Sequence, residues 1–225
     1  MEIGFDGIIA AAGGYIEFNN NKLLHKKVSK EDVEHLISYF NKNNIDFYLE
    51  SNGGLFASRN CKNHLRNIIN EAIVKEPELK EEMEKGMKPF IDCLIENENL
   101  IRDDINKISF LGSKMPIKSI EEEFSGIFNV IQSTVPIFGE NSGELSIPGI
   151  HKALAIEFLL EKLNASRKDT YAYGDGINDS EMLEYVNVGV AMGNAKKELK
   201  EIADDITDSV DENGIYNSFK KYKLI

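Results

Sequence analysis

Two carboxylates and one amide lie within a six-residue, glycine-containing segment at residues 174–179. Asp175, Asn178 and Asp179 supply the polar side chains, and Gly174 and Gly176 allow the backbone to turn tightly between them. Hard oxygen ligands of this kind suit Mg²⁺, which is commonly held by one or two carboxylates together with water and substrate phosphate. The ordinary alternative is turn and helix-cap chemistry, which favours the same residue types. The segment alone does not decide between the two interpretations.

The neighbouring residues place this segment between a strand and a helix. Residues 169–173 are β-branched or aromatic at several positions and predict a short strand, whereas residues 179–185 contain cap-forming and helix-forming residues. A loop in that position lies at the carboxyl end of a strand, where open α/β sheets bind ligands. A second glycine-containing segment at residues 188–195 follows at the spacing of the next strand-helix unit, and Lys152 precedes the first by one helix.

These three motifs together resemble the C-terminal half of the haloacid-dehalogenase (HAD) superfamily. Residues 149–225 are similar to Cof-type phosphatases, whose late motifs read Lys, then GDGxND, then AMGNA. The resemblance implies a catalytic and phosphate-binding role for Lys152, which would neutralise the nucleophile and the phosphoryl oxygens. It further implies that Asn178 binds phosphate, that Asp175 binds Mg²⁺, and that Asp179 either holds the water shell of the metal or orients Lys152. Without the resemblance, Lys152 is an ordinary lysine at a helix start.

The sequence departs from this family at its first motif. The family attacks phosphorus with the first aspartate of Asp-x-Asp-Gly-Thr and uses the second as general acid and base, and this sequence contains no such motif. Residues 5–16 align better with the third strand of the family. On that alignment about 40 residues, roughly one and a half strand-helix units, are missing from the front, and the truncated chain is expected to be nearly inactive. An incomplete sheet would leave residues 8–9 and 171–173 without their usual neighbours and would allow self-association. Three explanations are open: the sheet re-pairs in an unusual way, another chain fills the gap, or, as we favour, the sequence is a fragment of a longer protein.

The expected fold class is α/β, with a HAD-like Rossmannoid parallel sheet as the core and an inserted α+β cap domain. Residues 1–17 and 148–225 are predicted to form the core, and residues 18–147 the cap. Within the cap we expect a hairpin at 15–18 and 23–26, a helix that Ser29 caps, and an antiparallel sheet with helices on one face. The sequence predicts strands at 46–50, 107–111, 128–132 and 135–138, and a helical stretch at 62–106. Glu50, Asn52 and Arg59 either face a substrate or are surface polar residues.

Composition excludes several other classes. The net charge of −12 argues against binding to nucleic acid or to anionic membranes, both of which require basic patches. No apolar run reaches the length of about 18 residues that a membrane span requires. Cys61 and Cys93 form neither a CxxC pair nor a disulfide pattern, so a reducing, cytoplasmic location is expected.

The leading functional hypothesis is a Mg²⁺-dependent phosphomonoester hydrolase that acts on small phosphorylated metabolites such as sugar phosphates. A sugar phosphomutase is a related alternative, although its loop usually carries extra residues before the Asn-Asp pair. An alternative of another class is a non-catalytic, degenerate HAD scaffold that binds a ligand or a partner.

Overall fold

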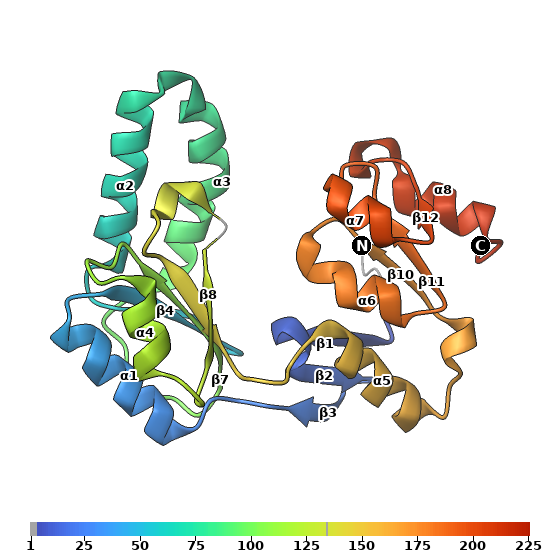
Figure 1. Ribbon diagram of the computed structural model, residues 1–225, viewed down its shortest axis with the longest axis horizontal. Helices are drawn as coiled ribbons and strands as arrows, with labels where there is room; N and C mark the ends of the chain where they lie inside the picture. Colours follow the sequence, from blue (N-terminus) through green and yellow to red (C-terminus); the bar gives the residue numbers. More distant parts are fainter. Residues whose placement is uncertain (1–3, 134) are drawn as a thin grey trace. The chain divides into compact units, whose positions relative to one another are not determined.

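The computed structural model describes residues 4–133 and 135–225, apart from the side chains of residues 79, 82 and 136. The chain forms two compact units (Figure 1), one made of Met1–His25 with Ile150–Ile225 and the other of Lys26–Gly149. The sequence placed the corresponding boundaries after residues 17 and 147. The first division of the structure falls after His25, because the strand that contains His25 pairs with the strand before it.

The first unit contains a parallel three-stranded sheet in the order β10-β11-β12. Its strands, helices and short 3-10 turns are β10 (Tyr171–Gly174), β11 (Val188–Ala191), β12 (Asp205–Ile206), α5 (Lys152–Leu163), η4 (Arg167–Asp169), η5 (Ile177–Asp179), α6 (Ser180–Tyr185), α7 (Lys197–Ile202), η6 (Val210–Glu212) and α8 (Gly214–Lys221). Ala172, Leu183, Ala191 and Leu199 are buried together in its core. The predicted strand-loop-helix context of residues 174–179 is therefore present.

The N-terminal residues of this unit form a separate antiparallel sheet, β1 (Gly7–Ala10), β2 (Tyr15–Phe18) and β3 (Asn21–His25), with η1 (Ala11–Gly13) after β1. Asn19 and Asn20 form the β2–β3 turn with φ of 49° and 60°, left-handed values that asparagine tolerates well. Among the described residues β1 pairs only with β2, so it does not pair with β10, as expected. A Cβ on Gly13 would lie 2.6 Å from the carbonyl oxygen of His151, so this hairpin packs closely on the start of α5.

The second unit is built on a six-stranded sheet in the order β6-β5-β4-β7-β9-β8. The β5–β6 pair is parallel and the other pairs are antiparallel. The elements of this unit are α1 (Lys30–Lys42), β4 (Asp46–Ser51), β5 (Gly54–Ala57), α2 (Cys61–Lys75), η2 (Pro77–Leu79), α3 (Lys80–Cys93), β6 (Leu94–Ile95), β7 (Ile105–Leu111), α4 (Ile117–Glu123), β8 (Asn129–Gln132), η3 (Pro136–Phe138) and β9 (Gly143–Ser146).

Helices cover both faces of this sheet, and the expectation of helices on one face is wrong (Figure 1). Strand β4 explains this arrangement, because its successive side chains point to opposite faces of the sheet. Phe47 and Leu49 pack with residues of α1 and α4, whereas Tyr48 packs with residues of α2 and α3. Each face of β4 therefore belongs to its own apolar cluster.

Other local predictions have mixed outcomes. Ser29 caps α1 by accepting a hydrogen bond from the backbone N–H of Asp32, as predicted. The helical stretch predicted to reach residue 106 ends at Cys93, and residues 136–138 form a 3-10 turn instead of a strand. Strands β5, β6 and β9 of this unit were not predicted.

Candidate active site

The predicted lysine and aspartate meet directly in the first unit. Lys152 is the first residue of α5, and its Nζ forms an ion pair with Oδ1 of Asp179, 27 residues later. Asp179 is 6% exposed, whereas the Lys152 side chain is about one-third exposed. A buried carboxylate requires such a cation or several hydrogen bonds, since desolvation penalises its charge.

The second oxygen of Asp179 is also bound. Oδ2 accepts hydrogen bonds from the backbone N–H groups of Asp175 at 3.1 Å and Gly176 at 3.2 Å. The loop after β10 therefore folds around the carboxylate of Asp179. Glycine at 174 makes this possible, because a Cβ there would lie 2.6 Å from the Cβ of Asp179. The burial of Asp179 therefore explains Gly174, whereas a Cβ on Gly176 would lie 2.4 Å from Oδ1 of Asn178.

Asp175 and Asn178 remain exposed beside this ion pair. Asp175 Oδ2 accepts a hydrogen bond from the amide of Asn194 at 3.3 Å, and Oδ1 of Asn194 accepts one from the backbone N–H of Val210 at 3.2 Å. Asn194 therefore connects the loop after β10 with the loop after β11 and with η6. Asn194 lies within the glycine-containing segment at residues 188–195, for which no role was predicted, although its position after β11 was the available signal.

The chemistry of these oxygens decides which of them could hold Mg²⁺. The carboxylate of Asp175 is exposed and suits direct coordination, whereas both oxygens of Asp179 already accept hydrogen bonds. Asp179 therefore fits the second of its two predicted roles, the orientation of Lys152. In the part of the chain that the structure describes, no three His, Cys, Asp or Glu side chains form a metal-binding group. The residues present fit a Mg²⁺ ion that takes few protein ligands and several water or phosphate oxygens.

His151 has a structural role next to Lys152. It is the N-cap residue of α5, and its Nδ1 accepts a hydrogen bond from the backbone N–H of Leu154 at 3.4 Å. The Nδ1 atom also lies 3.3 Å from a carboxylate oxygen of Glu181, a contact that is attractive only when Nδ1 carries a proton and no longer accepts from Leu154. The cap bond fixes the start of α5 and therefore the position from which the Lys152 side chain extends.

The candidate substrate residues of the second unit do not share one cluster. Glu50 lies 3.1 Å from Nζ of Lys107, which also contacts Glu144 at 3.0 Å. Burial alone would lower the pKa of Lys107, but the two carboxylates outweigh it and raise that pKa. Arg59 is exposed.

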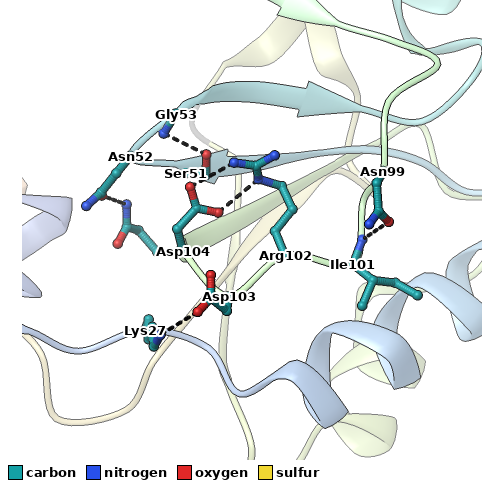
Figure 2. Close-up of polar contacts among 10 residues, drawn as sticks. Lys27, Ser51, Asn52, Gly53, Asn99, Ile101, Arg102, Asp103 and Asp104 are labelled. Atoms are coloured by element: carbon teal, nitrogen blue, oxygen red, sulfur yellow. Dashed lines mark hydrogen bonds and ion pairs between the residues drawn. The ribbon is translucent and has the colours of Figure 1, made fainter.

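Asn52 belongs to a polar network at the β4–β5 turn (Figure 2). It accepts a hydrogen bond from the side chain of Asn106 at 2.8 Å. Beside it, Arg102 donates two hydrogen bonds to Asp104, at 2.9 and 3.0 Å, and its guanidinium lies 3.8 Å from the centre of the Phe56 ring. The paired charges raise the pKa of Arg102 and lower that of Asp104. The bond from Asn106 ties the turn to β7, and the contact between Arg102 and Phe56 ties the segment before β7 to β5.

Comparisons with known proteins agree with this architecture. The sequence model of the haloacid dehalogenase-like hydrolases matches residues 1–219. Phosphatase YwpJ of Bacillus subtilis (strain 168) is 26% identical over 222 residues, which cover 95% of this chain and 78% of YwpJ. The putative phosphatase YkrA of the same organism is 53% identical over 77 residues, which cover 34% of this chain but only 30% of YkrA. The crystal structure of a hypothetical protein from Geobacillus kaustophilus HTA426 matches 99% of this chain and 78% of its own, with a TM-score of 0.76 and 27% identity.

The α/β fold and the family model together define a hydrolase of the haloacid dehalogenase-like class. Because the family's sequence model covers nearly the whole sequence, this chain belongs to the haloacid dehalogenase-like hydrolases.

Proposed function

We propose that this chain is a Cof-type phosphomonoester hydrolase that binds the phosphoryl group of small phosphorylated metabolites, such as sugar phosphates, together with Mg²⁺ and releases phosphate slowly. The observation that carries the proposal is the Lys152–Asp179 ion pair, which the loop amides of residues 175 and 176 hold at the carboxyl end of β10. Asp179 orients Lys152, and Lys152 supplies positive charge to phosphoryl oxygens. Asn178 donates its amide to the same group.

Asp175 would coordinate Mg²⁺ in this proposal. The bound ion neutralises charge on phosphoryl oxygens and fixes their orientation. Asn194 positions the Asp175 carboxylate through the hydrogen bond between them. The sequence contains no Asp-x-Asp-Gly-Thr motif, so we expect the release of phosphate from bound substrate to be slow.

Binding of inorganic phosphate in the presence and absence of Mg²⁺, measured by calorimetry, tests the proposal. Replacing Lys152 by Met should weaken binding about tenfold or more, because one charge-assisted contact is lost. The matched control is Lys168→Met, which removes an exposed lysine of η4 in the same unit. Asp175→Asn should abolish the dependence on Mg²⁺. Equal binding by wild type and Lys152→Met, or no binding by the wild type, would overturn the proposal.

A non-catalytic scaffold is the second candidate, and sheet edges support it. Strand β1 pairs only with β2, and β10 only with β11, among the described residues. Such edges can accept a strand from a partner or from a second copy of the chain. Release of phosphate from a panel of sugar phosphates separates the two candidates. Mg²⁺-dependent release that Lys152→Met reduces supports the hydrolase, whereas binding without release supports the scaffold.

A further inference from the structure

A cavity of about 870 Å³ lies in the second unit, between α2, α3 and the segment around η3. Its volume is within the range of small-molecule sites. Apolar side chains form most of its lining, among them Ile68 of α2, Met83 and Met87 of α3, and Ile137 and Phe138 of η3. None of these residues belongs to the phosphoryl site proposed above.

Buried residues and hydrogen bonds of the second unit hold the walls of this cavity in place. Cys61 and Leu65 of α2 and Ile91 of α3 are fully or almost fully buried in the apolar cluster beneath it. On the η3 side, the buried hydroxyl of Ser142 donates a hydrogen bond to the carbonyl of Phe138 and accepts one from the backbone N–H of Gly112 at 2.8 Å. The methionines leave the α3 wall adaptable, since their side chains are flexible and polarisable.

One polar group of the lining is oriented by a relay of hydrogen bonds. The Nδ1 of His64 lies 2.9 Å from Oδ2 of Asp46, and Oδ1 of Asp46 accepts a hydrogen bond from the hydroxyl of Ser58 at 3.0 Å. Because the carboxylate of Asp46 is an acceptor, Nδ1 of His64 carries a proton, and in the neutral ring Nε2 then carries the lone pair. The Cε1–Nε2 edge of the ring lies against Gly112, and both residues line the cavity.

The charges of the lining select the kind of ligand. Among the described lining residues, Glu71 and Glu76 place two carboxylates against the ammonium of Lys75, so this lining has a net negative charge and disfavours anions. An apolar body suits the walls, and a hydrogen-bond donor suits Nε2 of His64.

We propose that this cavity binds a small, uncharged or cationic molecule with an apolar, ring-sized body and one hydroxyl or amine donor, which pairs with Nε2 of His64. The ligand differs in chemistry from the phosphorylated substrate, so the site would serve as a second binding site of the same chain. The proposal stands whether or not the phosphoryl site is correct.

Amide correlation spectra of the full chain, titrated separately with 2-naphthol and 2-methoxynaphthalene, test this inference. The two probes share a ring system, but only the first has a donor. We expect saturable shifts at the lining residues of α2 and α3, and binding of 2-naphthol about fivefold tighter, the effect of one hydrogen bond. His64→Phe should abolish that preference.

A second pair of variants keeps the test valid if His64→Phe unfolds the unit. Ala72→Leu adds volume within the cavity and leaves His64 and Asp46 untouched, whereas Val74→Leu changes an exposed position of the same helix outside the lining. Ala72→Leu should weaken binding of both probes, and Val74→Leu should bind as the wild type does. Absence of saturable shifts, equal affinity for the two probes, or unchanged binding by Ala72→Leu would each overturn the inference.

Discussion

The most consequential contacts at the scale of single residues are those of the Asp179 carboxylate. Lys152 and two backbone N–H groups bind its two oxygens, and the side chain is almost fully buried. Removal of one partner from a buried, hydrogen-bonded ion pair costs more than the pair contributes, because the remaining charge stays desolvated. Asp179 is therefore a structural residue of the loop as well as a candidate functional residue.

Replacing Asp179 by Asn tests this structural role. The substitution keeps the size of the side chain but removes its charge, so we expect a loss of unfolding free energy of about 1–3 kcal/mol. Urea denaturation followed by circular dichroism measures the change. Asp169→Asn, at an exposed position of η4, is the control and should stay within about 0.5 kcal/mol of the wild type. Equal stability of the two variants would contradict the prediction.

The two cysteines should differ sharply in reactivity. Cys61 is fully buried, and burial raises the pKa of its thiol to about 12, with the negative charges of Asp46 and Glu96 adding to the effect. Cys93 is exposed. Since the thiolate is the reactive form, a disulfide reagent should label only Cys93 in the native chain at pH 8, and both thiols after unfolding. Rapid labelling of the native Cys93→Ser variant would show that Cys61 is accessible.

Some contacts of single residues could be predicted from the sequence, and others could not. Lys152 and Asp179 were identified together because their motifs resemble a family pattern, and the structure joins them. The bridging role of Asn194 was not predicted, because it depends on contacts with a loop 19 residues earlier and with Val210, 16 residues later. Spacing along the chain does not reveal which loops fold against one another.

At the scale of elements, the last helix of the chain is tied to the edge strand of the parallel sheet. Asp205 of β12 accepts hydrogen bonds from Nζ of Lys221 at 2.5 Å and from the hydroxyl of Tyr222 at 2.8 Å. The bond from Lys221, followed by that from Tyr222, lowers the pKa of Asp205 below its ordinary value of 3.8, although burial opposes the shift. Burial and the bond to Asp205 raise the pKa of Tyr222 to about 12.

This ion pair predicts a specific pH dependence of stability. A carboxyl with a lowered pKa in the folded state stabilises the fold above its ordinary pKa, and that contribution is lost as pH falls through the folded-state value. The Asp205→Asn variant should therefore be less stable than the wild type by about 1 kcal/mol near pH 7. The difference should narrow below pH 3.8. Thermal denaturation between pH 7 and pH 2.5 measures both, and a difference that widens in acid would contradict the assignment.

Elements with a strong local signal were the ones predicted correctly. The β2–β3 hairpin carries two adjacent asparagines in its turn, and α1 begins at a serine cap with an apolar stripe after it. Strand β9 has only four residues, among them Gly143 and two polar side chains, so its alternation is too weak to detect. It is nevertheless a strand, because it pairs with both β7 and β8. Tertiary pairing outweighs local preference there.

At the scale of the whole molecule, the two units are assembled differently from the chain. The first unit is assembled from two separate segments of the chain, whereas the second is one continuous segment. The described part of the chain contains no helix that is both long and apolar enough to cross a bilayer. Two apolar clusters, one on each face of the six-stranded sheet, lie entirely within the second unit. Its core therefore requires no residue of the first.

We predict that residues 26–149 fold as an isolated fragment. A unit of this size with its own core on both faces of a sheet can bury enough apolar surface to be stable alone. Far-ultraviolet circular dichroism and cooperative urea unfolding should report a native-like fold. Ile108→Val, at a fully buried position of β7, should lower the unfolding free energy by about 1 kcal/mol in the fragment and by the same amount in the second unit of the full chain. A fragment without cooperative unfolding, or one in which this substitution has no effect, would show that the second unit depends on the rest of the chain for its core.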